Sequence, residues 1–250
     1  MNSELCGACA AKELSDNPII KDLFECKMCG CFNRLPRHKF TDIPYTISKC
    51  SLSKEAAEID SLHYINVLLD MEIYRKIENG LLWDVGCYIG GLVWQANKRG
   101  WRAHGNDIQK EHIEYGRDVY NVNIFEGHFE ELPIVKNCYD VVIFHHGIEH
   151  IIDPIKAIQK AISILRDDGI IYLSHPCIPS KELLHQYADT STSVGGHLYE
   201  WTYESFKFFV SLFEILEVEK CYVGSRDGKS IIPSTQTWVL RKKASDYNNI

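Results

Sequence analysis

From Gly80 onward, short apolar runs alternate with amphipathic stretches. The runs LLWDV, YDVVIF and GIIYLSHP predict buried β-strands, and RAHGND predicts another strand after the first of them. The intervening segments GLVWQANKR, QKEHIEYGRDVY and DPIKAIQKAISILR predict helices, and the last of these begins at an Asp-Pro cap. Such alternation is typical of a parallel sheet with helices on both faces, so the expected fold class is α/β, doubly wound.

The flanking segments extend this pattern. From Lys54 to about Asn79, apolar residues recur at steps of three and four, which predicts a helical segment that Gly80 ends. Near the C-terminus, FEILEVEKCYV and TQTWVLRKK predict two further strands joined as a hairpin. The whole therefore predicts a mostly parallel sheet that contains these six strands.

Composition and charge narrow the class of protein. The chain has 250 residues, of which 45% are hydrophobic and 24% charged, as in an ordinary globular protein. Its 27 Lys and Arg against 34 Asp and Glu give a net charge of −7, which disfavours broad contact with nucleic acid. No apolar run approaches the roughly 20 residues that span a bilayer, and the first residues lack the order of an export signal. We therefore expect a cytoplasmic protein without membrane association.

The segment LLWDVGCYIGGL places glycines between a predicted strand and a predicted helix. Gly86 permits a tight turn, and Gly90 with Gly91 permits close approach of a ligand to the backbone. Asp84 ends the strand, and Asp107 ends the next one, where open α/β sheets bind ligands. The glycine spacing differs from the dinucleotide fingerprint G-x-G-x-x-G. A ligand loop with two acids is preferred over a purely structural turn.

Five segments follow one another in register: DVGCYIGG, GNDI, GHFEELP, YDVVIFHHGIEHIIDP and LRDDGIIYLSHP. In order and spacing they resemble the class I S-adenosylmethionine (SAM)-dependent methyltransferases, and this resemblance covers roughly residues 80 to 220. The similarity is greatest to members acting on sugars, quinones and similar metabolites. It implies a Rossmann-like, mostly parallel sheet of seven strands with SAM as cofactor. HLYEWTYESFKFFV continues the resemblance as a segment that shapes the substrate side.

The resemblance implies a role for individual residues. The loop after the first strand would hold the amino-acid end of the cofactor, Asp107 would bind its ribose, and Phe129 and Glu130 would lie beside the adenine. Tyr88 stands where the family usually has glycine, so its ring is expected over the methionine moiety. His128 stands where many members have an acid that contacts the adenine amine. The expected cofactor contacts are Asp84, Gly86, Cys87, Tyr88, Gly90, Asp107, Ile108, Phe129, Glu130 and His145.

Three histidines are candidates for catalysis. Methyl transfer to a hydroxyl needs a base, and imidazole has a suitable pKa. His146 would sit where methyl donor and acceptor meet. His150 follows Glu149 as in the family's Glu-His pair, whose histidine is the proposed base in some sugar-modifying relatives. The alternative is that His150 packs under the next helix and caps a turn.

His197 is the third candidate, in GGHLYEW. The preceding glycines suggest a mobile lid in which Tyr199 and Trp201 close over an acceptor, whereas the alternative is an ordinary loop packed by aromatic rings. Residues 146–150 also spell H-x-x-E-H, an inverted metalloprotease motif that requires a continuous helix. Because a strand precedes it and Gly147 interrupts it, we expect no such metal site.

The N-terminal cysteines follow a different pattern. Cys6-x-x-Cys9 and Cys26-x-x-Cys29 are separated by 16 residues, the spacing of a structural four-cysteine zinc site. Cys31 is either a substitute ligand or a bystander. A redox role is disfavoured because no thioredoxin-like βαβ unit surrounds these cysteines. The chain then divides into a zinc-binding ribbon (1–40), a linker with a helical cap (41–79) and a SAM-binding methyltransferase domain (80–244).

Three functions compete at this stage. The preferred one is O-methylation of a small-molecule acceptor, with a nucleotide-linked sugar or another precursor of a surface glycan or metabolite as the candidate. The alternative is an rRNA or tRNA methyltransferase whose ribbon grips RNA, and only RLPRHK gives it local charge support. The acidic balance and the lack of an N/D-P-P-Y/F motif count against RNA. A non-catalytic binding module is disfavoured by Asp84 and Asp107.

Overall fold

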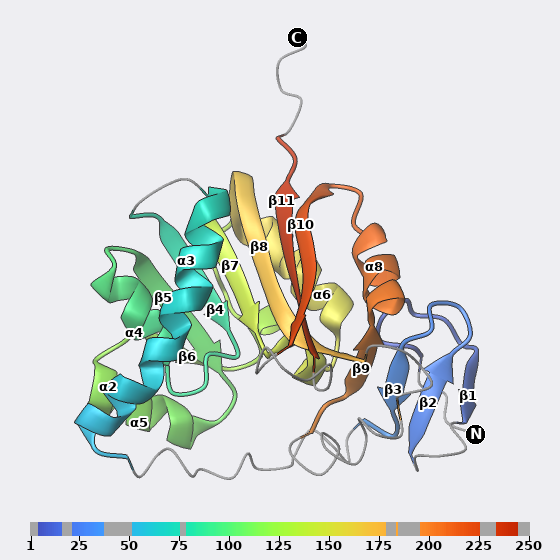
Figure 1. Ribbon diagram of the computed structural model, residues 1–250, viewed down its shortest axis with the longest axis horizontal. Helices are drawn as coiled ribbons and strands as arrows, with labels where there is room; N and C mark the ends of the chain where they lie inside the picture. The colour runs from blue at the N-terminus through green and yellow to red at the C-terminus, as the bar shows by residue number, and fades with distance from the viewer. Residues whose placement is uncertain are drawn as a thin grey trace.

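The computed structural model describes residues 5–16, 22–37, 52–75, 79–178, 184, 196–225 and 234–244. Seven of its strands form the central sheet, in the order β6-β5-β4-β7-β8-β11-β10 (Figure 1). The first five are parallel, and β11 runs antiparallel to both of its neighbours. The α/β prediction, with a closing hairpin, is confirmed. The strands are β4 (Leu81–Val85), β5 (Arg102–Asp107), β6 (Ile124–Glu126), β7 (Tyr139–His145), β8 (Leu165–Ile178), β10 (Leu216–Ser225) and β11 (Ser234–Lys242).

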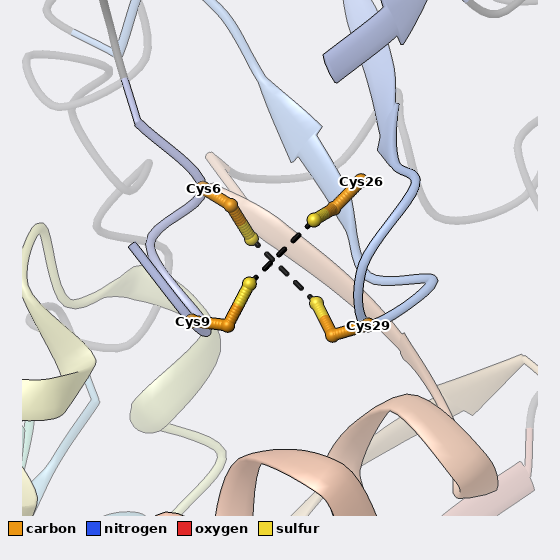
Figure 2. A group of neighbouring side chains, drawn as sticks. All are labelled: Cys6, Cys9, Cys26 and Cys29. Carbon is orange, nitrogen blue, oxygen red and sulfur yellow. Dashed lines mark hydrogen bonds between the residues drawn. The ribbon is translucent and has the colours of Figure 1, made fainter. Parts of the chain in front are cut away.

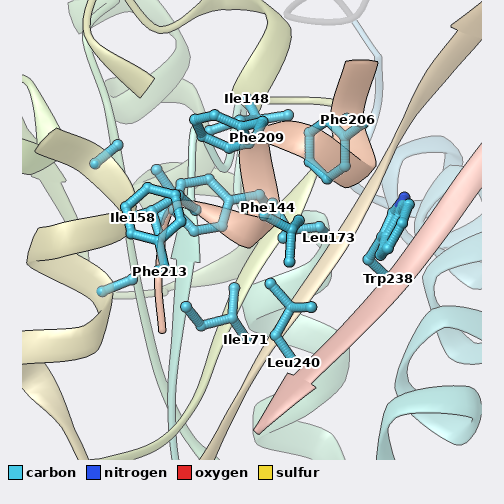
Figure 3. Packing of buried hydrophobic residues seen from close by; sticks show 14 of the residues in the cluster. Phe144, Ile148, Ile158, Ile171, Leu173, Phe206, Phe209, Phe213, Trp238 and Leu240 are labelled. Atoms are coloured by element: carbon cyan, nitrogen blue, oxygen red, sulfur yellow. The ribbon is translucent and has the colours of Figure 1, made fainter. Parts of the chain in front are cut away.

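Helices cover both faces of this sheet. On β7, Val141 and Ile143 pack into one core while Phe144 packs into the other, because successive strand residues point to opposite faces. Figure 3 shows the second core, where rings from α8 meet aliphatic residues of α6 and the strands. The α-helices are α2 (Lys54–Asp60), α3 (Tyr64–Arg75), α4 (Gly91–Lys98), α5 (Lys110–Tyr120), α6 (Pro154–Ile164) and α8 (Tyr203–Ser211). Short 3₁₀ turns are η1 (Ser61–His63), η2 (Phe129–Glu131) and η3 (Ile148–His150).

The predicted helical segment from Lys54 is interrupted at η1. The Ser61 hydroxyl donates to the Glu58 carbonyl oxygen over 2.6 Å and accepts from the Gln95 side chain over 2.8 Å. A serine that bonds to the preceding turn competes with regular helix geometry, which explains the break.

A buried ion pair anchors the end of α3 to the sheet. The Arg75 guanidinium donates to Asp140 over 2.8 Å, and the other carboxylate oxygen accepts from the Leu81 amide over 2.8 Å. Asp140 is only 1% exposed. One carboxylate therefore joins the cap helix to the beginnings of β4 and β7.

The N-terminal segment is joined to the main sheet. Its strands β1 (Leu14–Asp16), β2 (Leu23–Cys26) and β3 (Phe32–Arg34) are antiparallel, and β3 also pairs with β9 (Tyr199–Thr202). Strand β9 in turn runs parallel to the end of β8, so the sheet continues into the ribbon (Figure 1). The boundary predicted near residue 40 lies outside the described residues. Among the described helices, none is long and apolar enough to cross a membrane.

Candidate functional site

The carboxyl ends of β4, β5 and β7 meet at one edge of the sheet, as the pairing of β4 with both neighbours requires. Gly86 follows β4 with φ of +68°, the left-handed region that favours glycine. A Cβ added there would lie 3.9 Å from the Cα of Gly147, so the loop after β4 lies beside the loop after β7. At Gly91, an added Cβ would lie only 2.8 Å from the Tyr64 ring, which requires a small residue at the start of α4.

Asp107 braces the predicted cofactor loop. One carboxylate oxygen accepts from the Tyr88 amide over 2.9 Å, and the other accepts from the Gln109 amide over 2.9 Å. The side chain is 12% exposed. Each oxygen has a second lone pair, so the carboxylate can also accept from hydroxyl groups of a ligand.

Asp84 lies deeper, at 3% exposure. Burial, with a smaller contribution from the negative charge of Asp107, raises the pKa of Asp84 well above its ordinary value. A buried carboxylate of this kind is stabilised by a cationic group. The residues present therefore fit a ligand that carries an ammonium or sulfonium charge together with ribose hydroxyls, as SAM does.

The other predicted cofactor residues fall in different surroundings. The Phe129 ring is 2% exposed and packs edge-on against Phe144, with ring centroids 5.9 Å apart, so the ring belongs to the core. The Tyr88 ring meets His112 edge-on at 4.2 Å. Ile108 is half exposed and Cys87 is buried. Glu130 is partly buried, His128 is exposed, and Gly90 caps α4 with φ of +79°. The His145 ring lies 5.7 Å from that of Tyr64.

His146 is the most accessible of the three candidate histidines, with 39% of its side chain exposed. Its Nδ1 lies 3.7 Å from a carboxylate oxygen of Glu149, and its amide donates to the Ser174 carbonyl oxygen over 2.7 Å. Its φ of +53° is uncommon for a residue with a side chain. Such outliers concentrate at functional sites, where surrounding contacts hold them.

His150 and His197 form a partly buried pair. Their ring centroids are 4.8 Å apart. His150 Nδ1 lies 3.2 Å from the Gly196 carbonyl oxygen, and His197 Nδ1 lies 3.3 Å from a Glu200 carboxylate oxygen. The Leu198 amide donates to the Glu149 carbonyl oxygen over 2.8 Å, which brings the two segments together.

The segment after His197 differs from the predicted lid. Tyr199 and Trp201 belong to β9 and are 1% and 0% exposed. The Tyr199 hydroxyl donates to the Ile152 carbonyl oxygen over 2.7 Å. Both rings therefore pack inside the protein, because β9 is held between β8 and β3.

The ionisation of Glu149 is influenced by the three histidines around it. Burial opposes ionisation of Glu149, but His146, His150 and His197 outweigh it and hold its pKa below the ordinary value. Burial lowers the pKa of His150. Burial acts in the same direction on His197, but the carboxylate of Glu200 outweighs it and raises the His197 pKa.

Four of the N-terminal cysteines converge on one point (Figure 2). The Sγ atoms of Cys6 and Cys29 are 3.7 Å apart, and those of Cys9 and Cys26 are 3.6 Å apart. A tetrahedral zinc with bonds of ~2.3 Å would hold its sulfur ligands ~3.8 Å apart. Cys31 lies outside this group, with its Sγ directed at the carbonyl oxygens of Phe32 and Glu200.

The sequence gives no indication that Tyr64 and Glu200 belong to the site. In the sequence, Tyr64 cannot be distinguished from the other apolar positions of the cap helix, and no motif marks Glu200. Their contacts with Gly91 and His197 come from segments distant in the chain. Only the folded structure reveals them.

Residues 78–227 match the methyltransferase domain family. The chain therefore belongs to this family, whose members of the class I fold transfer a methyl group from S-adenosylmethionine. Solved structures agree on the fold. A SAM-dependent methyltransferase of Methanosarcina mazei has a TM-score of 0.56 and 14% identity, covering 68% of this chain and 95% of that one. The YcgJ protein of Bacillus subtilis has a TM-score of 0.58 and 14% identity, covering 73% of this chain and 99% of that one.

Curated relatives match a shorter stretch. A ubiquinone biosynthesis O-methyltransferase of Vibrio cholerae is 31% identical over 130 residues, which cover 47% of this chain and 51% of the relative. The enzyme of the same name from Actinobacillus pleuropneumoniae is 29% identical over 128 residues, covering 45% and 54%. The chain thus spans about half the length of the curated relatives that it matches.

Proposed function

We propose that this protein transfers a methyl group from SAM to a hydroxyl group of a small molecule. When bound, SAM supplies an electrophilic methyl on a sulfonium. Asp107 would accept hydrogen bonds from the ribose hydroxyls, and the buried carboxylate of Asp84 would offset the positive charge of the cofactor. The loop carrying Gly86 allows the cofactor to approach the backbone closely. Catalysis of such a transfer depends mainly on alignment of donor and acceptor.

His146 is the observation that carries this proposal. It is the most exposed of the three histidines, and the loop that bears it lies against the predicted cofactor loop at Gly147. Glu149 lies against its Nδ1 side, so Nε2 is the nitrogen positioned to take a proton from an acceptor hydroxyl. His150 and His197 are more buried, and we assign them a different role below.

A hydroxyl acceptor is supported by the names of the matched relatives, all of them O-methyltransferases of ubiquinone biosynthesis. We therefore place a phenolic hydroxyl first among the acceptor groups to test. A nucleotide-linked sugar remains a prediction from the sequence, and no comparison supports it.

We also propose that Cys6, Cys9, Cys26 and Cys29 hold one structural zinc. The sulfur spacing supports this, and so does Asn33, whose side-chain amide donates to the Cys6 sulfur over 3.5 Å. Such a donor stabilises a thiolate charge beside the metal. Zinc would supply folding energy that this short three-stranded segment gains only weakly from its own core.

The contacts of two arginines in the ribbon do not favour RNA binding. Arg34, in the basic stretch that suggested nucleic acid, is 7% exposed and lies 3.9 Å from the Glu200 carboxylate. Arg37 donates to the Leu5 carbonyl oxygen and to Asn33. These cations are engaged within the protein, so they are poorly placed for the phosphate contacts that RNA binding needs.

The test is methyl transfer from tritiated SAM. The acceptors are an ortho-dihydroxybenzoate, a nucleotide-linked sugar and total tRNA, each offered separately to the full chain. Tritium recovered in a methyl ether of the phenol or of the sugar supports the proposal. Counts only in RNA would overturn it.

A further inference from the structure

A second group of metal-type ligands lies at the end of β7, apart from the cysteine ribbon. We propose that Glu149, His150 and His197 bind a divalent transition metal. One ligand atom from each lies within 4.8 Å of the others. The inference does not depend on the acceptor or on the proposed methyl transfer.

Glu149 is the residue that points most directly to a cation. It is 1% exposed, and neither carboxylate oxygen has a hydrogen-bond partner among the residues that the structure describes. The Nδ1 atom of His146 lies 3.7 Å from one of these oxygens, beyond hydrogen-bond distance. An ionised carboxylate in such a place is costly unless it is paired or coordinates a metal. A metal bound by one oxygen would meet that need while the other oxygen still faces His146.

The two histidines are oriented as metal ligands are. In each ring, Nδ1 faces an acceptor: the Gly196 carbonyl oxygen for His150, and the Glu200 carboxylate for His197. A carbonyl or carboxylate oxygen accepts, so Nδ1 carries the proton and the basic lone pair lies on Nε2. Metal-bound histidines regularly donate their other ring N–H to a carboxylate or a backbone carbonyl, and this fixes the tautomer.

The ligand set indicates the class of metal. Two imidazoles and one carboxylate suit zinc and other first-row divalent ions, and three protein ligands leave a position for water. Nitrogen and oxygen ligands of a tetrahedral zinc lie ~3.4 Å apart. The 4.8 Å spread must therefore close by ~1.4 Å, which side-chain rotation can supply.

The sequence hides this site because its parts are distant. Residues 149 and 150 follow β7, whereas residue 197 precedes β9, 47 positions later. The H-x-x-E-H spelling names a different set, 146 with 149 and 150, which needs a helix that is not formed there. The hydrogen bond from the Leu198 amide to the Glu149 carbonyl oxygen brings the neighbouring His197, the third proposed ligand, close to the other two.

Cobalt titration of the metal-stripped full chain tests the proposal, because Co²⁺ reports its ligands. Cobalt in the ribbon gives intense thiolate-to-metal charge transfer, whereas cobalt on nitrogen and oxygen gives only weaker visible bands. We expect a second equivalent with visible bands and no added charge transfer. Saturation after one equivalent, all of it thiolate-bound, would overturn the proposal.

Variants locate the second equivalent. In Glu149→Gln and in His197→Gln we expect it to be lost while the thiolate-bound equivalent persists, which also reports that the fold is intact. His104→Gln is the matched control, because that histidine is partly buried and contacts Tyr139 at the start of β7, whereas Glu149 and His150 follow the opposite end of that strand. A second equivalent that survives in both ligand variants would show adventitious binding and overturn the proposal.

X-ray absorption of the wild-type zinc protein needs no variant. Two sites predict nitrogen or oxygen ligands at ~2.0–2.1 Å together with sulfur at ~2.3 Å, whereas the ribbon alone predicts sulfur only. A sulfur-only spectrum at two zinc equivalents would therefore contradict the assignment, even if the variants fail to fold.

Discussion

At the scale of single residues, the account depends most on His146. His146→Ala should lower kcat by about a hundredfold to ten-thousandfold, the usual effect of removing a general base. Affinity for S-adenosylhomocysteine should stay nearly constant, because the role proposed for this side chain concerns the acceptor rather than the cofactor. Steady-state kinetics and calorimetry on the same preparation measure the two quantities. Near-normal turnover in the variant would mean that alignment alone drives the transfer.

Asp107 makes a separate prediction about the cofactor. Asp107→Ala should weaken binding of S-adenosylhomocysteine by about 1–3 kcal/mol, or about 5- to 150-fold, because ribose hydroxyls lose their acceptor. The variant also loses the hydrogen bonds from the Tyr88 and Gln109 amides. Part of the lost affinity therefore comes from a less well-ordered cofactor loop. Calorimetric affinity equal to wild type would remove Asp107 from the cofactor site.

The residues at strand ends could be predicted because the end of each strand is marked by a change from apolar to polar or glycine residues within a few positions of the sequence. Asp84 and Asp107 do lie at the carboxyl ends of adjacent strands. The sequence could not show that the Phe129 ring packs into the core, because burial depends on what covers η2. It also could not show the roles of Tyr64 and Glu200, whose partners come from distant segments.

At the scale of elements, the buried carboxylate of Asp140 is a main link between α3 and the sheet. Asp140→Asn should lower the free energy of unfolding by about 3–5 kcal/mol, because buried Arg75 loses its buried counter-charge and keeps the exposed carboxylate of Asp168, 3.5 Å away. Glu72→Gln is the control, since its pair with Arg99 is more exposed and such pairs contribute about 1 kcal/mol or less. Urea unfolding measures both variants. Equal, small effects would show that the α3 anchor lies elsewhere.

Alternation of apolar runs and amphipathic stretches was enough to predict the central sheet, because those elements form from local periodicity. The break at Ser61 was not predictable, since it depends on a bond to Gln95 from another helix. The sequence predicts a loop or lid where β9 forms. The four residues of β9 carry too little local pattern to predict a strand, and pairing with β8 and β3 is what stabilises them. Such pairing depends on tertiary contacts rather than on propensity.

At the scale of the whole molecule, the ribbon is part of the same sheet as the site. Strand β3 pairs with β9, and Arg34 faces Glu200, which contacts His197. If the ribbon holds the proposed zinc, losing it through Cys26→Ser should therefore lower turnover as well as the melting temperature. Cys138→Ser, a partly buried thiol outside the ribbon, is the control. If the Cys26 variant lost its zinc yet kept full turnover, the ribbon would be an independent appendage.

The central claim is that the edge formed by β4, β5 and β7 is where cofactor and acceptor meet. A crystal structure with S-adenosylhomocysteine tests it most directly. The account predicts that ribose hydroxyls bond to Asp107, that the amino-acid end lies near Asp84 and that the thioether sulfur faces His146. A ligand bound elsewhere, or one whose sulfur points away from His146, would contradict it.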